Sequence, residues 1–244
     1  PVHWCPGADL WAITRHADAE AVLKDPRFSR QAFLDQCQDR MGPQPILAMQ
    51  RHELVFMDNP RHRELRTVIG AAITPKSMQE LGPRVEAHIE RRLAPWRQRG
   101  SMDVVQDFAR TYPTEVASLW LGVPEEDRPR IVEWIFPLVA GRGIARDEAT
   151  TAAANQAADH FTDYFRQLIA RRRHEPHDDL VTSLVHAAAA HPDLLGDDDL
   201  ISLFIAVFAA GHGPGIALLA NTLLALLRHP TELARLRDHP EWTA

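Results

Sequence analysis

Apolar residues recur along most of the chain with the three- and four-residue spacing of amphipathic helices. Between residues 76 and 99, for example, Leu81, Val85, Ile89 and Leu93 follow one another at intervals of four and therefore share one helix face. Similar patterns predict helices over residues 19–25, 60–74, 107–121, 125–140, 148–173, 178–190, 197–229 and 231–238. The chain is therefore expected to be mostly α-helical.

Only short segments have the character of strands. Residues 10–14, LWAIT, are apolar and β-branched and predict a strand near the N-terminus, and MDVV at 102–105 is a second candidate. Residues from about 31 to 50 are polar and irregular, so we expect a surface loop there. Asp18 and Asn59 are candidate N-caps of the helices that follow them.

The longest helical pattern contains an interruption. The run from Phe208 to Pro230 is apolar almost throughout, yet glycine and proline, which destabilise a helix interior by about 1 and 3 kcal/mol relative to alanine, lie in its middle. Pro214 also cannot donate a hydrogen bond to the carbonyl of Ala210. We therefore expect one long helix over 197–229 that is distorted near 211–215.

Composition and charge argue against several classes of protein. The 244 residues are 45% hydrophobic and 25% charged, as in an ordinary soluble protein, and the net charge of −6 gives no general attraction to nucleic acid. The two cysteines, Cys5 and Cys37, lack metal-type spacing, which suits a reducing cytoplasm. The apolar run has the length of a membrane span, but His212 and the glycine–proline cluster interrupt it. We expect a cytoplasmic protein with neither a membrane nor a nucleic-acid partner, folded as one domain over 1–244.

One basic turn is a candidate binding site. His62 and Arg66 are four residues apart and share a helix face, and Arg61 and Arg63 add to the charge. The pattern is typical of a solvated basic face. It also suits a clamp for an anion, because the arginine fork matches the geometry of carboxylate or phosphate. The spacing alone leaves both interpretations open.

Two runs of like charge lie at predicted helix ends. Arg171–Arg173 ends one helix pattern and is expected to be solvated, and Asp197–Asp199 begins the longest one. Their signs compensate the helix dipole at those ends. We therefore assign no site to either run.

Four segments, taken in order, resemble a bacterial cytochrome P450, which is a haem-thiolate monooxygenase. They are ITRHADAEAVLKDPRFS, FMDNPRHRELRTVIGAAITP, DDLVTSLV and DDDLISLFIAVFAAGHGPGIALLANTLLALLRHPTELARLRDHP. The resemblance spans nearly the whole chain but covers only the first part of such a protein. It implies an incomplete P450-like helical fold with a small N-terminal β element and one long central helix.

The resemblance also assigns roles to single residues. His62 and Arg66 match an H-x-x-x-R whose two members hold a haem propionate. The long helix matches the one that crosses the distal face of the haem, where the pattern is A/G-G-x-D/E-T-T and a local opening gives room for dioxygen. The resemblance therefore implies a haem cofactor in the full-length protein and the following cofactor-binding residues: His62, Arg66, Ala210, Gly211 and Pro214.

The same helix departs from the family at the residues that carry protons. Gly213 stands in place of the acid, and Pro214 and Gly215 stand in place of the two threonines. The family uses the acid and threonine to supply the protons that O–O cleavage needs. His212, at the variable position, is titratable and is the one candidate for a substitute relay.

The family's iron ligand is missing as well. It is a cysteine in a loop of the form F-x-x-G-x-x-x-C, and neither Cys5 nor Cys37 lies in such a loop. The E-x-x-R of the family's proximal core helix would lie beyond Ala244. We therefore predict no metal ligand in this chain.

Two functions remain open. In the first, the chain is the N-terminal part of a haem monooxygenase that acts on a small, partly apolar substrate and takes electrons from a ferredoxin-type partner. In the second, it is a haem-free relative that binds and activates a partner enzyme, as auxiliary members of the family do. The resemblance places substrate specificity in variable loops, here within residues 31–50 and 138–150, and in residues of the long helix, and it leaves the substrate unnamed. Apolar residues of that helix, such as Phe204, Val207 and Phe208, indicate a partly apolar ligand, but core packing explains them equally well.

Overall fold

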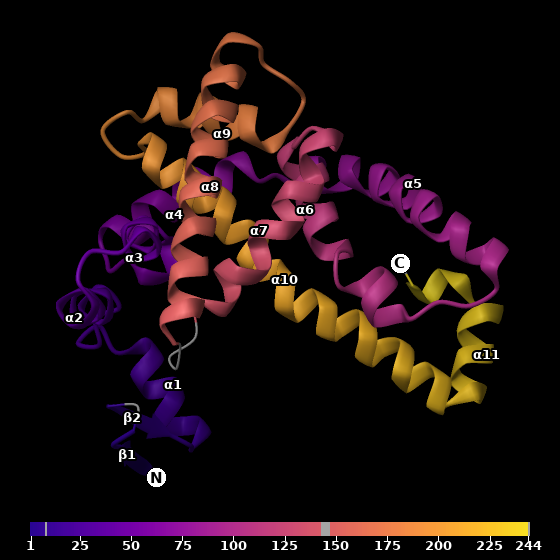
Figure 1. Cartoon of the computed structure of the whole chain (residues 1–244), viewed down its shortest axis with the longest axis horizontal. Coiled ribbons are helices and arrows are strands. Elements are labelled where there is room, and N and C mark those ends of the chain that lie inside the picture. The colour runs from indigo at the N-terminus through magenta and orange to yellow at the C-terminus, as the bar shows by residue number, and fades with distance from the viewer. Residues whose placement is uncertain (8, 143–146, 244) are drawn as a thin grey trace. The chain divides into compact units, whose positions relative to one another are not determined.

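A computed structural model of the chain describes residues 1–7, 9–142 and 147–243. Most of these residues are helical, so the predicted mostly α fold is confirmed (Figure 1). Within the described residues, β1 (Val2–Cys5) and β2 (Leu10–Ile13) form a two-stranded antiparallel sheet. Its register places Trp4 opposite Trp11, and β2 confirms the strand predicted over 10–14.

The helices follow the periodic segments of the sequence. They are α1 (His16–Lys24), α2 (Gln31–Met41), α3 (Pro45–Gln50), α4 (Arg61–Ala72), α5 (Pro75–Arg99), α6 (Tyr112–Leu121), α7 (Arg128–Ala140), α8 (Glu148–His174), α9 (Leu180–Ala190), α10 (Asp197–Arg228) and α11 (Pro230–Asp238). Short helical turns are η1 (Leu54–Phe56), η2 (Val104–Ala109), η3 (Glu125–Asp127) and η4 (Pro240–Thr243). The predicted helix over 107–121 is divided between η2 and α6.

The chain divides into two compact units, each built from two separate segments. Unit 1 comprises Pro1–Ile73 and Glu133–Ala206, and unit 2 comprises Thr74–Val132 and Val207–Ala244. The division falls inside α7 and α10, so that each of these helices contributes residues to both units. A single domain over 1–244 stays a prediction.

Aromatic side chains form the centre of unit 1. Phe161 and Phe165 on α8 stack with 6.2 Å between ring centroids, and Phe165 lies 5.3 Å from Phe204 at the start of α10. All three are fully buried, and burial of each such side chain contributes about 1.5–3 kcal/mol. Helices α3 and α9 both pack on α8 (Figure 1). Core packing therefore accounts for Phe204.

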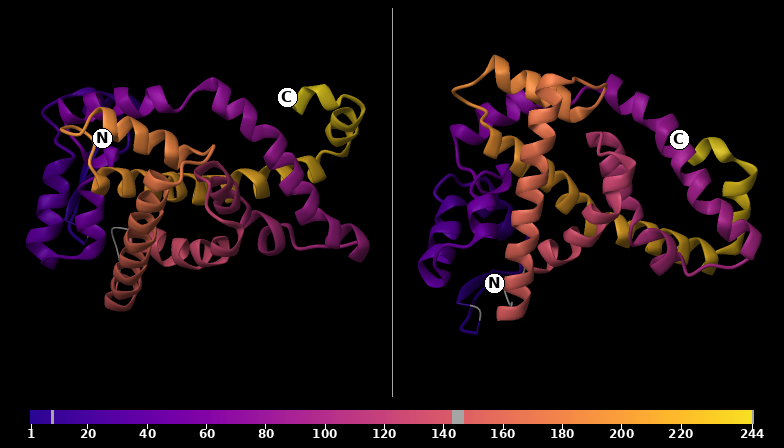
Figure 2. Two further views of the ribbon diagram at one scale, coloured as in Figure 1. Left: turned by 90° about the horizontal axis from the view of Figure 1, so that it is seen from above. Right: turned by 45° about the horizontal axis from the view of Figure 1, so that its top comes forward.

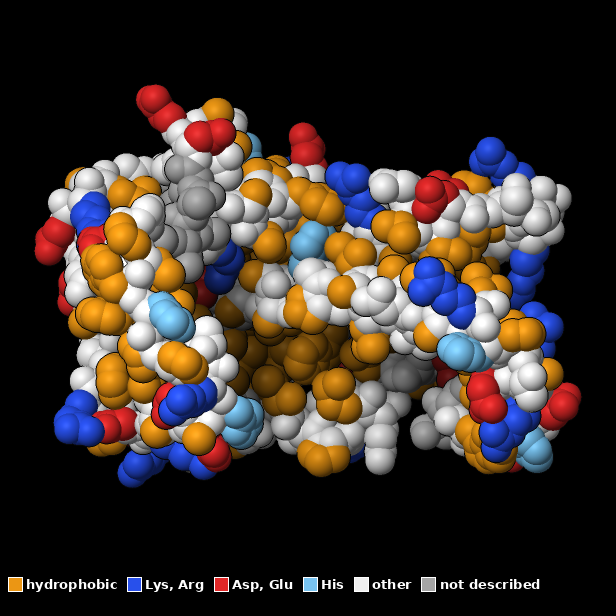
Figure 3. Space-filling view, turned by 90° about the horizontal axis from the view of Figure 1, so that it is seen from below, with side chains coloured by type: hydrophobic (Ala, Val, Ile, Leu, Met, Phe, Trp, Pro, Cys, Tyr) orange, Lys and Arg blue, Asp and Glu red, His pale blue; other side chains and the backbone are white. Residues whose placement is uncertain are grey.

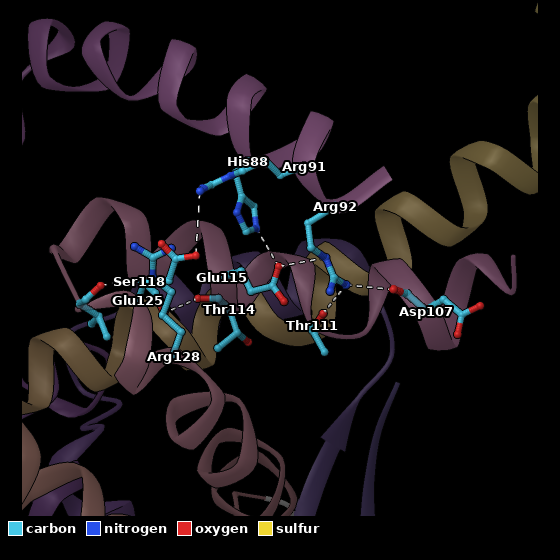
Figure 4. Close-up of polar contacts among 11 residues, drawn as sticks. His88, Arg91, Arg92, Asp107, Thr111, Thr114, Glu115, Ser118, Glu125 and Arg128 are labelled. Atoms are coloured by element: carbon cyan, nitrogen blue, oxygen red, sulfur yellow. Dashed lines mark hydrogen bonds and ion pairs between the residues drawn. The ribbon is translucent and has the colours of Figure 1, made fainter. Parts of the chain in front are cut away.

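Polar contacts join α5 to α6 in unit 2. His88 Nε2 on α5 lies 2.7 Å from Glu115 Oε2 on α6, and Arg92 Nε lies 3.3 Å from the same oxygen (Figure 4). Arg92 also donates to the carbonyl of Asp107 and to the hydroxyl of Thr111 (Figure 4). His88 and Glu115 are largely shielded from solvent, so these contacts fix the first turn of α6.

Two predictions of local structure are wrong. Residues 31–50 are not a loop but contain α2 and α3, because Pro45 begins a helix whose Ile46, Leu47 and Met49 are buried. The segment 102–105 is not a strand. The carboxylate of Asp103 accepts hydrogen bonds from the amides of Val105 and Gln106 and thereby begins the short, wide helix η2.

The two predicted N-caps are also wrong. Helix α1 begins after Arg15, which places Asp18 inside its first turn, and α4 begins after Pro60 rather than Asn59. Neither helix has a side-chain cap. An acid in the first turn still interacts favourably with the helix dipole, which explains why Asp18 resembles a capping residue in the sequence.

Helix α10 is continuous from Asp197 to Arg228, as Figures 1 and 2 show. The predicted long helix is confirmed, and it runs through residues 211–215 without ending. The distortion predicted there stays a prediction. A proline disfavours helical structure at the preceding residue mainly through clashes with that residue's Cβ. Gly213 has no Cβ, so the helix passes Pro214 with the loss of one hydrogen bond.

Helix α10 is also long and apolar enough, by length and composition, to cross a membrane. The core helix of a soluble protein passes the same test. On the face drawn in Figure 3, acidic and basic side chains are interspersed among hydrophobic ones.

Candidate functional site

The predicted site residues lie on two helices in two different units. His62 and Arg66 are on α4 in unit 1, and Ala210–Gly215 are on α10 in unit 2. Each group is therefore described within its own unit. The substrate loop expected over 138–150 is described up to Arg142 and from Asp147, and its residues 143–146 lie outside the described part.

The two α4 residues are free to receive a ligand. Arg66 is exposed, and its guanidinium makes no hydrogen bond or ion pair with any residue that the structure describes. His62 is half-buried and lines a hollow of about 380 Å³ together with Met57 and Asp58. Because the two residues are four apart, they present a cation and an imidazole on one helix face.

A carboxylate close to His62 is already occupied. Asp58 accepts a hydrogen bond of 2.5 Å from the hydroxyl of Ser29 and one of 3.0 Å from the amide of Arg30. These bonds, the Ser29 bond first, hold the pKa of Asp58 below its usual range. Asp58 is therefore a fixed anion of the hollow, held by residues of the Ser29–Arg30 turn.

The first turn of α4 is tied to the first turn of α10. Arg61 Nη2 lies 2.8 Å from Asp199 Oδ1, and His52 Nδ1 lies 2.9 Å from the same oxygen. The amide of Gly196 donates to the other oxygen at 3.0 Å. Burial alone would raise the pKa of Asp199, but the bonds from His52, Gly196 and Arg61 together hold it below its ordinary value. Arg61 thus positions the turn that carries His62.

The open side of the α10 segment consists of small residues. Ala210, Gly211, Gly213 and Pro214 are exposed, and a Cβ added at Gly211 or Gly213 would meet no atom within 4 Å. A flat group can therefore approach this backbone closely. The assignment of Ala210, Gly211 and Pro214 to cofactor contact stays a prediction.

The other side of the segment packs against α6. His212 is buried, and its Nδ1 lies 3.2 Å from the hydroxyl oxygen of Thr114. Burial, with the charge of Arg110 as a second cause, lowers the pKa of His212. A Cβ added at Gly215 would lie 2.9 Å from Cγ of Pro113. This environment gives His212 a packing role, and its role as a proton relay stays a prediction.

Sequence reasoning missed several groups of shielded charges. They include Asp199 with His52 and Arg61, Glu53 with Arg142, and Glu115 with His88 and Arg92. The partners of Asp199 and Glu53 lie far away in the sequence, so no local spacing indicates them. For Glu53 the sequence held one weak signal, because this acid stands between two apolar segments. In the structure it is only 1% exposed.

Neither cysteine lies in a site with other ligands. Cys5 is in β1 and Cys37 is in α2, and both are half-buried free thiols. Within residues 1–7, 9–142 and 147–243, no group of three His, Cys, Asp or Glu side chains is arranged to hold a metal ion.

The chain is similar along almost its whole length to bacterial cytochrome P450s. It is 34% identical to nocardicin C N-oxygenase of Nocardia uniformis subsp. tsuyamanensis and 33% identical to the polyketide biosynthesis cytochrome P450 PksS of Bacillus subtilis, in each case over 96% of this chain and 57% of the relative. The crystal structure of CalO2 matches with a TM-score of 0.85 and 29% identity, over 99% of this chain and 60% of that one. No family model matches the chain. The chain thus spans a little more than half the length of the relatives it matches.

Proposed function

Because the chain is homologous to bacterial cytochrome P450s along nearly all of its length, we propose that it is a part of a haem-binding monooxygenase and that His62 and Arg66 hold a propionate of the haem. The observation that carries this proposal is the face of α4, where the side chains of His62 and Arg66 have no partner among the described residues while their neighbour Arg61 is tied to Asp199. An anion is the partner that this face lacks.

The residues present fit a haem in two further respects. The exposed strip around Gly211 and Gly213 leaves room for a flat group. One propionate would match the charge-assisted geometry of an arginine and an imidazole on one helix. When bound through a cysteine thiolate, a haem supplies the electron density that favours O–O bond cleavage. Neither Cys5 nor Cys37 has the sequence context of that ligand.

The remaining parts of the function follow from the relatives. A small, partly apolar substrate, a ferredoxin-type electron donor and a cytoplasmic location belong to this proposal. The relatives are named as oxygenases and hydroxylases, among them the vitamin D(3) 25-hydroxylase of Pseudonocardia autotrophica. These names support an enzyme over a haem-free auxiliary protein.

A haemin titration of the 244-residue chain tests the assignment of the propionate. Haem binding is followed by the Soret absorption and by quenching of tryptophan fluorescence. We expect His62→Leu with Arg66→Leu to weaken binding by about tenfold or more, since hydrogen bonds to charged groups contribute about 1.5–3 kcal/mol each.

The matched control is Arg63→Leu, which removes an exposed arginine of the same helix that the proposal does not assign to the propionate. It should leave the affinity unchanged. Equal weakening by the control, or no effect of the double variant, would contradict the assignment. For any longer product of the gene, the spectrum of the reduced, carbon monoxide-treated protein shows whether a thiolate binds the iron.

A further inference from the structure

The segment that joins α3 to α4 is hydrogen-bonded to the N-terminal part of α10. Asp199 and Ser202 are three residues apart on that helix and therefore share a face. The hydroxyl of Ser202 donates a hydrogen bond of 2.8 Å to the carbonyl of Met49 near the end of α3. Asp199 lies 2.9 Å from His52 and 2.8 Å from Arg61 at the start of α4. The segment is therefore held to α10 at both of its ends, within unit 1.

The carboxylate in this contact is itself fixed. Asp199 and Ser202 are both buried, so water competes little for their hydrogen bonds. The second oxygen of Asp199 accepts a hydrogen bond of 3.0 Å from the amide of Gly196, which ties the side chain to the residue before its own helix. Hydrogen bonds to a charged group are among the stronger ones in proteins. Asp199 therefore presents a rigid acceptor to the start of α4.

Arg61 connects this acceptor to the residues that we assign to the propionate. It directly precedes His62 in the first turn of α4, which has no side-chain cap. The buried apolar residues of the helix, Leu65 and Ile69, come later and hold its middle rather than its start. The bond between Arg61 and Asp199 therefore helps to fix the position of the His62 imidazole.

We propose that Asp199 is a positioning residue for the haem propionate: through Arg61 it holds the first turn of α4 so that His62 and Arg66 face the same anion. This inference rests on the proposed function of the α4 face. It adds to the site a buried carboxylate whose charge has the same sign as that of the ligand.

The charge of Asp199 separates this role from a simple electrostatic one. Its carboxylate offsets the attraction that Arg61 would exert on a propionate. If this were its only effect, Asp199→Asn would leave a free cation and strengthen the binding of an anion. If Asp199 positions His62, the same substitution weakens that binding. The two roles thus predict changes of opposite sign.

Haemin and its dimethyl ester test the proposal, because the ester has the same ring without ionised propionates. Both are titrated into the 244-residue chain in the same dilute detergent and followed by Soret absorption. We expect wild type to bind haemin at least about tenfold more tightly than the ester. Asp199→Asn should reduce this ratio about fivefold and leave the affinity for the ester within about twofold of wild type. The control Asp198→Asn changes an exposed neighbour and should keep the wild-type ratio.

The outcomes distinguish the inference from the function on which it rests. A ratio in Asp199→Asn that equals or exceeds that of wild type would overturn the positioning role and leave the propionate assignment intact. A loss of affinity that is the same for haemin and ester leaves the ratio unchanged, so it counts against the proposal as a general structural effect. Equal binding of haemin and ester by wild type would overturn the proposed function as well.

A second variant keeps the test decisive if thermal unfolding shows that Asp199→Asn does not fold. Arg61→Gln changes a side chain that is half exposed. It should lower the ratio about threefold relative to wild type, and this loss should persist in about 0.5 M NaCl, because salt screens the attraction of an exposed cation but does not restore a displaced turn. The matched control Arg63→Gln removes an exposed cation of the same turn, and any loss that it causes should disappear in the salt. If the loss in Arg61→Gln also disappears, Arg61 acts by charge alone and the proposal is wrong.

Discussion

Asp199 shows how a buried carboxylate is kept charged in this protein. It is 7% exposed, and His52, Arg61 and the amide of Gly196 all donate to it. The hydrogen bond to Asp199 is also the main cause that raises the pKa of His52. The two ionisable groups therefore stabilise the folded state over different pH ranges.

The His52–Asp199 pair makes stability depend on pH. A histidine whose pKa is raised in the folded state stabilises it fully below the unfolded value of about 6.5, and this contribution is lost as the pH rises through the folded value. Asp199 contributes above its unfolded pKa and loses its contribution as the pH falls through its depressed folded value. The unfolding free energy of the wild type should fall between pH 6 and pH 9 as His52 loses its proton. In His52→Gln this fall should be smaller by roughly 0.5–1 kcal/mol, and the difference is modest because His52 is partly exposed.

Urea unfolding at several pH values measures this difference. The control His174→Gln changes an exposed histidine that has no carboxylate partner within the described residues. It should keep the wild-type dependence on pH. The same slope in wild type and His52→Gln would show that the pair contributes nothing.

The sequence could not predict these buried charges. We expected two runs to be charges at helix ends, namely Asp197–Asp199 and Arg171–Arg173. In the structure Asp199 is buried. Arg172 is 6% exposed and donates a hydrogen bond of 2.7 Å to Asp179. His52 and Asp199 are 147 positions apart. A pattern of a few residues predicts that charges at a helix end interact with the helix dipole. It cannot predict a contact between residues so far apart in the sequence.

At the scale of elements, α6 and α10 approach each other closely in unit 2. The contact consists of the hydrogen bond between Thr114 and His212 and of Pro113 against Gly215. The glycines of α10 therefore have different surroundings. Gly215 permits the close approach of Pro113 on α6, whereas Gly211 faces open space within unit 2. The glycine-rich motif that looks uniform in the sequence has two different sides.

A pair of alanine substitutions tests this division. Gly211→Ala should raise the free energy of unfolding by about 0.5–1 kcal/mol, because alanine is the better helix residue and its Cβ meets nothing. Gly215→Ala should instead lower it by about 1–3 kcal/mol, since the new Cβ would overlap the rigid ring of Pro113. Chemical unfolding of both variants measures the difference. Equal stabilisation by both would mean that α6 and α10 do not meet at Gly215.

Periodicity predicted the long elements and failed on the short ones. Helices of the length of α5, α8 and α10 carry enough apolar positions to define a face. Helix α2 has Leu34 as its one buried residue, and α3 is a single turn and a half of apolar residues after Pro45. Neither contains a repeated pattern, so both were taken for loop. Of the candidate site, the helix positions of His62 and Arg66 were predicted, whereas the side of α10 that His212 occupies was not.

At the scale of the whole molecule, the proposed monooxygenase lacks its usual source of protons. Gly213, Pro214 and Gly215 carry no side-chain proton, and the side chain of His212 is packed against Thr114. A substrate hydroxyl or an ordered water would then have to serve. The proposed enzyme should consequently be poorly coupled, with electrons consumed in excess of product.

A double substitution should improve that coupling. Gly213→Glu with Pro214→Thr places an acid and a hydroxyl at exposed positions with open space around Gly213. Proton transfer by a positioned group contributes typically about 10²–10⁴-fold, so we expect the ratio of product to reductant consumed to rise in a haem-loaded form. Pro214→Ala is the control, because it changes the helix without supplying a proton. Tight coupling in the wild type would show that protons arrive by another route.

The division of the chain has a consequence for how it folds during synthesis. Unit 1 needs residues 133–206 in addition to 1–73, and unit 2 needs residues 207–244 in addition to 74–132. On a ribosome that adds about 5–20 residues per second, many seconds separate the two segments of either unit. Unit 1 becomes complete first, while residues 74–132 already wait without their partner segment. The nascent segment 74–132, with α5 and α6, therefore remains exposed until residues 207–244 are synthesised, after unit 1 is already complete.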